Sequence, residues 1–188
     1  MREKAVIILS GGMDSTTLLY DIISTGAEVS ALTFDYGQRH RKEIQCAMTT
    51  CRTLGIKQKV FPIPDFRELA YSSLTTDIPV PEGRYDEPLM KTTVVHNRNM
   101  ILLSLAGAYA LNIGADSLYY GAHSGDHAIY PDCRPEFVDV MQKAFSICDW
   151  EPLHLKAPYL HWSKGDIAKR GLSLGVDYSQ TWTCYKGE

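Results

Sequence analysis

Residue types that can hold a phosphate group gather in one segment, Ser10-Gly11-Gly12-Met13-Asp14-Ser15-Thr16. Glycine lets the backbone approach an anion closely, and Ser10, Ser15 and Thr16 offer hydroxyl donors. The segment follows an apolar run, Ala5–Leu9, and precedes a helical pattern. A helix N-terminus adds unpaired N–H groups and a partial positive charge, so this position favours an anion site. The spacing matches neither G-x-x-x-x-G-K-[ST] nor G-x-G-x-x-G.

Asp14 adds a negative charge to this predicted phosphate loop. A carboxylate repels phosphate unless a divalent cation lies between them, so Asp14 indicates magnesium. The alternative is an ordinary glycine turn in which Asp14 caps the helix. The place of the loop directly after the first predicted strand favours the functional interpretation.

The elements that must position this loop alternate between strand and helix over residues 1–61. Strands are predicted at 5–9 and 29–34, and a third strand ends at 60–61. Two helices lie between them: one follows the loop directly, and the other covers residues 38–54. Strand–helix alternation implies a parallel sheet with right-handed crossovers. The predicted fold class is therefore α/β.

The second half resumes this pattern after an irregular, proline-rich excursion over residues 62–93. An excursion of that length is usually functional, and residues 79–90 are the candidate closing loop, with a short helix expected near 65–71. The further predicted elements are a buried helix at 99–111, a strand at 117–121, a polar loop at 122–134, a helix at 135–148, a strand at 154–157 and a helix at 163–174. Ser163 and Asp166 form a capping pair for the last helix.

Composition narrows the class of protein. The 188 residues fit one domain, and a formal charge of −3 argues against a large nucleic-acid surface. The longest apolar stretch, 100–111, is too short to span a membrane, and no secretory leader is evident. Five cysteines without a disulfide-like rhythm fit a reducing compartment, so a cytoplasmic location is expected.

Four segments together resemble a known family. S-G-G-x-D-S after a first strand resembles the loop of ATP pyrophosphatase (PP-loop) enzymes. With it, F-D-Y-G-Q-R-H at 34–40, Y-P-D-C-R-P-E-F at 130–137 and T-W-T-C-Y-K-G at 181–187 resemble the QueC family of nitrile synthases. The resemblance implies a three-layer parallel sheet of the adenine-nucleotide α-hydrolase-like type, with a small C-terminal extension. It also implies an ATP-dependent homodimeric ligase that converts 7-carboxy-7-deazaguanine and ammonia to 7-cyano-7-deazaguanine, a queuosine precursor.

The resemblance assigns roles to individual residues. Nucleotide contacts are implied for Leu9, Ser10, Gly11, Gly12, Met13, Asp14, Ser15, Thr16, Arg98 and Asn99, and catalytic roles for Asp14, Arg39, His40 and Arg98. Contacts to the deazaguanine substrate are implied for Asp126, Tyr130, Asp132 and Arg134. The alternatives are a surface position for His40 and a cap on the helix opening at Pro135 for Asp132. Lys164 matches a lysine of the family but also suits a solvated helix terminus, and Cys133 is expected to be structural.

The C-terminal segment departs from the family. The resemblance implies a four-cysteine zinc site that begins at Cys184, but no further cysteine follows here, and one thiolate cannot make a tetrahedral site. Residues 1–175 are therefore expected to form the catalytic domain, with 176–188 as a remnant of the zinc segment. Either the sequence is a truncated copy, in which case the tail after Gln180 should be loose, or it works without zinc.

A second departure and two alternative functions remain open. The family's P-G-R-N turn is replaced by His96-Asn97-Arg98-Asn99, so the local backbone is expected to differ. A PP-loop ligase or tRNA-thiolating relative is the alternative enzyme, although neither the charge nor the absence of C-x-x-C supports it. A nucleotide-binding module without turnover is the alternative from another class.

Overall fold

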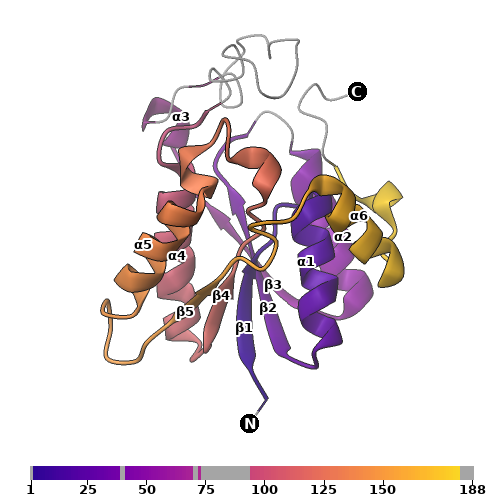
Figure 1. Ribbon diagram of the computed structural model, residues 1–188, viewed down its shortest axis with the longest axis horizontal. Coiled ribbons are helices and arrows are strands. Elements are labelled where there is room, and N and C mark those ends of the chain that lie inside the picture. Colours follow the sequence, from indigo (N-terminus) through magenta and orange to yellow (C-terminus); the bar gives the residue numbers. More distant parts are fainter. Residues whose placement is uncertain (1, 39–40, 70–71, 73–93, 183–188) are drawn as a thin grey trace.

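The computed structural model describes residues 2–38, 41–69, 72 and 94–182. Within these ranges the core is a five-stranded parallel sheet in the order β3-β2-β1-β4-β5. The strands are β1 Lys4–Ile8, β2 Glu28–Asp35, β3 Lys57–Pro62, β4 Ser117–Tyr119 and β5 His154–Lys156. The predicted α/β class and parallel sheet are confirmed (Figure 1).

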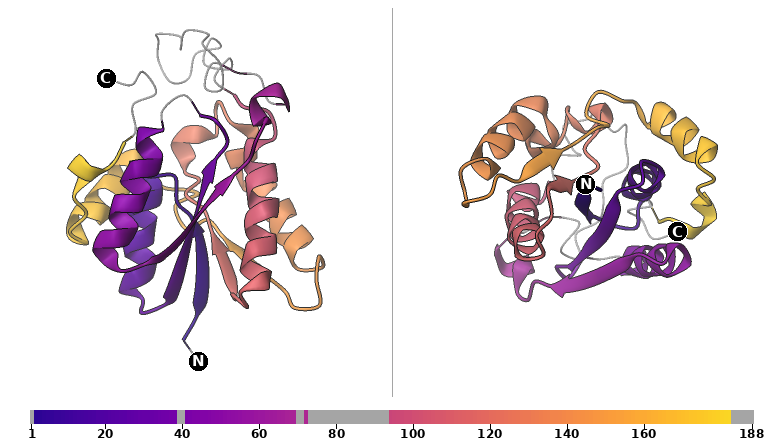
Figure 2. Two further views of the ribbon diagram at one scale, coloured as in Figure 1. Left: turned by 180° about the vertical axis from the view of Figure 1, so that it is seen from behind. Right: turned by 90° about the horizontal axis from the view of Figure 1, so that it is seen from below.

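Helices cover both faces of the sheet, which gives the three layers that were expected (Figures 1 and 2). They are α1 Met13–Ser24, α2 Lys42–Leu54, α3 Phe66–Leu69, α4 Arg98–Asn112, α5 Pro135–Phe145 and α6 Lys164–Ser173. Side chains alternate along β1, so Ala5 and Ile7 pack in the cluster under α1 and α2, while Val6 packs in the cluster under α4 and α5. Burial on both faces explains why this strand is a continuous apolar run.

The order of the strands creates the place for a ligand site. The chain moves from β1 outward to β2 and β3, then returns to the other side of β1 for β4 and β5. The connections after β1 and β4 therefore diverge to opposite faces and leave a crevice at the carboxyl ends of the strands. The loop at Ser10–Gly12 lies at this edge.

Three helices differ from the prediction, and one of them, α5, ends at Phe145 rather than at residue 148. α2 begins at Lys42 rather than at residue 38, because the Gln38 side chain bonds to the Tyr36 amide and the Phe34 carbonyl and holds the preceding turn. α4 is not buried all round: Leu103 is fully buried, whereas Met100 is 48% exposed. Ser163 and Asp166 form the predicted capping box of α6.

The C-terminal residues that the structure describes are attached to α1, α2 and the loop after β1. The Tyr178 hydroxyl lies 2.8 Å from the Thr17 hydroxyl, and the Trp182 amide donates to the Gly11 carbonyl at 3.0 Å. The Lys42 ammonium lies 3.7 Å from the centre of the Trp182 ring. These contacts at Trp182 differ from the loose tail after Gln180 that a truncated copy was expected to have. The rest of that segment, 183–188, lies outside the described residues.

Among the residues described, no helix combines the length and the apolar character that a membrane crossing requires.

Candidate active site

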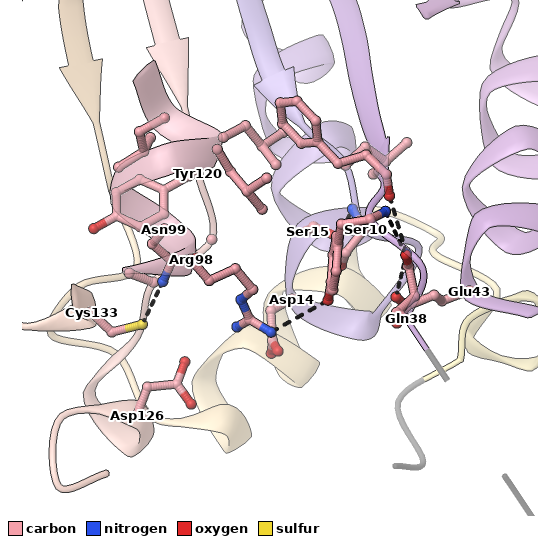
Figure 3. Close-up of a pocket in the computed structure, with 18 residues that line it drawn as sticks. Ser10, Asp14, Ser15, Gln38, Glu43, Arg98, Asn99, Tyr120, Asp126 and Cys133 are labelled. Atoms are coloured by element: carbon pink, nitrogen blue, oxygen red, sulfur yellow. Dashed lines mark hydrogen bonds between the residues drawn. The ribbon is translucent and has the colours of Figure 1, made fainter. Parts of the chain in front are cut away.

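One pocket opens at the crevice after β1 and β4. It is lined from five parts of the chain: the phosphate loop, the end of β2, the start of α2, the start of α4 and the segment after β4. The polar side chains on its wall are Ser10, Asp14, Ser15, Tyr36, Gln38, Glu43, Arg98, Asn99, Tyr120 and Asp126 (Figure 3). The structure thus brings together predicted residues that lie far apart in the sequence.

The phosphate loop is held by internal hydrogen bonds and by close packing against α2. Gly11 has φ +90°, and a Cβ atom at this position would lie 2.0 Å from the carbonyl oxygen of Glu43. The Ser10 and Ser15 hydroxyls lie 3.0 Å apart, and the Gly12 amide donates to the Ser10 hydroxyl. Glycine is therefore required at position 11 by both backbone conformation and packing against α2.

Asp14 does not cap helix α1. The N-cap residue is Gly12, which has no side chain, and the Oδ1 atom of Asp14 is buried without a hydrogen-bond partner. Burial raises the pKa of the Asp14 carboxyl, and the positive charge of Lys164 opposes that shift. A buried carboxylate oxygen without a partner, beside an anion loop, suits a divalent cation. The residues present therefore fit magnesium, with Asp14 as the protein ligand.

Arg98 projects into the pocket from the first turn of α4, toward the phosphate loop (Figure 3). Its guanidinium lies 3.5 Å from the Tyr36 hydroxyl. The preceding Asn97 adopts a left-handed conformation with φ +57°, which asparagine tolerates better than most residues. The His96-Asn97 departure from the family's turn is thus accommodated, because asparagine can adopt the conformation that glycine favours.

Asp132 supports the start of α4 and not the start of α5. Its Oδ2 atom accepts a hydrogen bond from the Asn99 amide at 3.0 Å, and the Asn99 side chain donates to the Asp132 carbonyl and the Cys133 sulfur. Arg134 is the N-cap residue of α5, and no side-chain cap bond forms there. The alternative in which Asp132 caps the helix at Pro135 is therefore wrong.

Asp132→Ala is expected to destabilise the fold by about 1 kcal/mol, since it removes a carboxylate that caps a helix. For a chain of this size, that corresponds to a melting temperature lowered by roughly 2–4 °C. Thermal unfolding followed by circular dichroism measures the effect. Asp139→Ala, at an exposed position on α5, is the control and should leave the melting temperature unchanged. Equal melting temperatures for Asp132→Ala and the parent chain would contradict this role.

The other predicted site residues lie in different surroundings. Tyr130 is buried in the core cluster, and Arg134 donates to the His127 carbonyl at 2.7 Å; neither lines the pocket. Their roles in substrate binding stay predictions. Burial raises the pKa of the Cys133 thiol, as expected of a structural cysteine. Arg39, His40 and Cys184 lie outside the described residues.

Zinc does not fit the residues that the structure describes. In those ranges, no group of three or more His, Cys, Asp or Glu side chains is arranged to hold a metal ion. Cys46, Cys51, Cys133 and Cys148 are separate free thiols, and burial raises the pKa of Cys51 to about 11. No chemical step is therefore assigned to zinc.

Sequence reasoning missed a pair of polar residues on the wall beside the phosphate loop. The side-chain oxygen of Gln38 accepts a hydrogen bond from the Tyr36 N–H. The side-chain NH2 group of Gln38 donates to the Phe34 carbonyl and, at 3.0 Å, to a carboxylate oxygen of Glu43. Burial raises the pKa of Glu43. Gln38 lies within a segment typical of the family, which was its signal in the sequence, whereas nothing local distinguished Glu43 from a solvated helical residue.

Glu43→Gln is expected to raise stability at neutral pH. The folded state holds the pKa of Glu43 above its usual value of 4.5. The contribution of Glu43 to folding stability is therefore complete below pH 4.5, and it is lost as the pH rises through the pKa of the folded state. Glutamine does not titrate, so the melting temperature of the variant should exceed that of the parent chain at pH 7, and the difference should shrink toward pH 4.5. Calorimetry across this range measures it, with Glu136→Gln, at an exposed position, as control. A difference independent of pH would contradict the assignment.

The fold and the site define an α/β protein whose ligand pocket lies at the carboxyl ends of a parallel sheet. A solved 4-thiouridine synthetase, in complex with RNA and bound ATP, has a TM-score of 0.57 and 20% identity, covering 95% of this chain and 42% of that one. At that identity the likeness concerns the fold alone. A family model described as "Queuosine biosynthesis protein QueC" matches residues 4–188, and the chain belongs to this family.

Relatives at high identity agree with this membership. A "7-cyano-7-deazaguanine synthase" of Methanoregula boonei is 63% identical over 186 residues, covering 98% of this chain and 86% of the relative. Another of that name, from Hahella chejuensis, is 57% identical, covering 98% of this chain and 80% of the relative. The predicted family is therefore confirmed, and the tRNA-thiolating alternative is set aside.

Proposed function

We propose that this chain converts 7-carboxy-7-deazaguanine and ammonia to 7-cyano-7-deazaguanine, using ATP to activate first the carboxylate and then the amide. One observation carries the proposal: the loop with the unpartnered Asp14 oxygen and the Arg98 side chain line the same pocket. This pocket lies in a chain 63% identical to a relative named for that product.

The proposed chemistry balances with two molecules of ATP. The carboxylate oxygen attacks the α-phosphorus, pyrophosphate leaves, and ammonia then displaces AMP to give the amide. The amide oxygen attacks a second ATP in the same way, and loss of AMP and of both N–H protons gives the nitrile. Each activation turns a poor leaving oxygen into a good one, and each substrate oxygen departs on one nucleotide.

The residues of the pocket supply binding, orientation and charge compensation. The hydroxyls of Ser10 and Ser15, with the N-terminus of α1, would receive the phosphate oxygens. Arg98 would neutralise the charge that develops on the departing pyrophosphate. Magnesium, held by Asp14, supplies electrostatic shielding of the phosphates when bound.

Mass spectrometry on one incubation tests the proposal. The mixture contains the chain, 7-carboxy-7-deazaguanine labelled with oxygen-18 in its carboxylate, ATP, magnesium and ammonium. The expected products are the unlabelled nitrile and AMP that carries the label. If the products are instead the nitrile, ADP and labelled phosphate, the activation step is phosphorylation and not adenylation. ATP binding without any product would instead support a non-catalytic nucleotide-binding module.

The proposal includes the assembly and location implied by the family. We expect a homodimer that acts in the cytoplasm on a small-molecule substrate, with no nucleic-acid partner. Light scattering of the purified chain measures the oligomeric state directly.

A further inference from the structure

His123 is a buried side chain beside the pocket that the proposed function does not yet use. It follows β4 and its side chain is only 1% exposed. The Gly125 amide donates to its Nδ1 atom at 3.0 Å. A nitrogen that accepts a hydrogen bond carries no proton, so the neutral ring carries its proton on Nε2. The local backbone therefore fixes which nitrogen of His123 is a donor.

The Nε2 atom lies between two carboxylates from different parts of the chain. It is 3.4 Å from an oxygen of Asp126 and 3.7 Å from an oxygen of Asp14. Both aspartates line the pocket, one from the start of α1 and the other from the segment after β4 (Figure 3). An N–H group on Nε2 at these distances would be attracted to both carboxylates.

Two neighbouring carboxylates repel each other unless something lies between them. The charge of Lys164 opposes this repulsion at Asp14, whereas the charge of Asp126 adds to it. Without a donor near both carboxylates, the two side chains would turn apart. That change would remove the Asp14 oxygen from the position that the phosphate loop requires.

The ring itself has little freedom to move. A Cβ atom on Gly125 would lie 2.9 Å from the imidazole carbon between the two nitrogens, so the Gly125 backbone packs directly against the ring. The adjoining Ser124 is bonded to the Trp162 carbonyl through both its amide and its hydroxyl. The ring is thus held by the segment after β4 and by the chain that leads into α6.

We propose that His123 is a positioning residue that directs its Nε2–H group between Asp14 and Asp126 and holds both carboxylates toward the nucleotide. This inference rests on the proposed function for its kinetic consequence, whereas the proton position and the geometry stand independently of it. A role limited to the local turn would need only the Nδ1 acceptor.

Two substitutions separate these roles, because asparagine and glutamine each reproduce one nitrogen of the ring. His123→Asn keeps an acceptor for the Gly125 amide and loses the group that faces the aspartates. His123→Gln reaches the aspartates with its NH2 group and loses the local acceptor. His161→Gln, at an exposed position, is the control.

Steady-state nitrile formation should separate the variants. We expect kcat to fall about 100-fold in His123→Asn, as for other misplaced reacting groups. His123→Gln should stay within about 10-fold of the parent chain, although it melts at a lower temperature because it has lost the local acceptor. A kcat for His123→Asn that equals or exceeds the kcat for His123→Gln would overturn the proposal.

A second measurement does not depend on turnover. Nitrogen-15 NMR of the histidine rings should show His123 protonated on Nε2, with a shift of that resonance in Asp126→Asn. A proton on Nδ1, or no response to Asp126→Asn, would overturn the proposal. If the parent chain makes no nitrile, the proposed function fails. The positioning role of His123 is then still decided by NMR and by the calorimetric affinity of the two variants for Mg·ATP.

Discussion

Asp14→Asn is expected to reduce nitrile formation by at least about 100-fold while leaving the fold intact. The Asp14 Oδ1 atom is buried and makes no hydrogen bond within the protein, so its replacement by an amide breaks no bond of that oxygen. Asparagine keeps the shape of the side chain but loses the charge that would hold magnesium against the phosphates. The loss should appear as weaker Mg·ATP binding and a lower kcat, measured by calorimetry and by pyrophosphate release.

The matched control lies on the same helix. The Asp21 side chain is bonded to the Arg170 guanidinium and accepts from the Tyr159 hydroxyl, so both of its oxygens have protein partners. Asp21→Asn should therefore lower the melting temperature and leave kcat unchanged, the reverse of the pattern at Asp14. If the two variants lose activity to the same extent, the assignment of Asp14 to the nucleotide site is wrong.

Gly11→Ala is expected to abolish measurable turnover and to lower the melting temperature more than the substitution Gly26→Ala does. The added Cβ would lie 2.0 Å from the Glu43 carbonyl oxygen and 2.9 Å from the Ala47 amide nitrogen, both backbone atoms of α2. Backbone cannot move aside as a flexible side chain does, so either the loop or the helix must shift. A shift of the loop would displace the hydroxyls and amides that the proposed function directs toward the phosphates of ATP.

Gly26→Ala separates the packing effect from the conformational one. Gly26 has φ +83°, close to the +90° of Gly11, but an added Cβ there meets nothing within 4 Å. The control should cost about 1–2 kcal/mol for its left-handed conformation and keep full activity. Thermal unfolding and the nitrile assay are run on both variants. A Gly11→Ala chain as active as Gly26→Ala would show that the close approach of the loop to α2 is not required.

The sequence by itself determined the order of elements and the phosphate loop. The run Ala5–Leu9, the glycines after it and the helical pattern that follows are local signals, because periodicity and backbone freedom depend on neighbouring residues. They predicted the parallel sheet and the place of Ser10 and Asp14 at its edge correctly. The motif segments also identified the family, which the comparisons then confirmed.

The tertiary structure alone decided which polar residues face the site. His123 and Glu43 look like ordinary residues of a loop and a helix, and only tertiary packing places Glu43 on the wall of the pocket and His123 beside Asp14. Asp132 was predicted to contact substrate, with a cap on the next helix as the alternative, and its carboxylate instead accepts a bond from the start of α4. The physical reason is the same in each case: these contacts join residues distant in sequence, and burial and direction are set by packing, which no local pattern encodes.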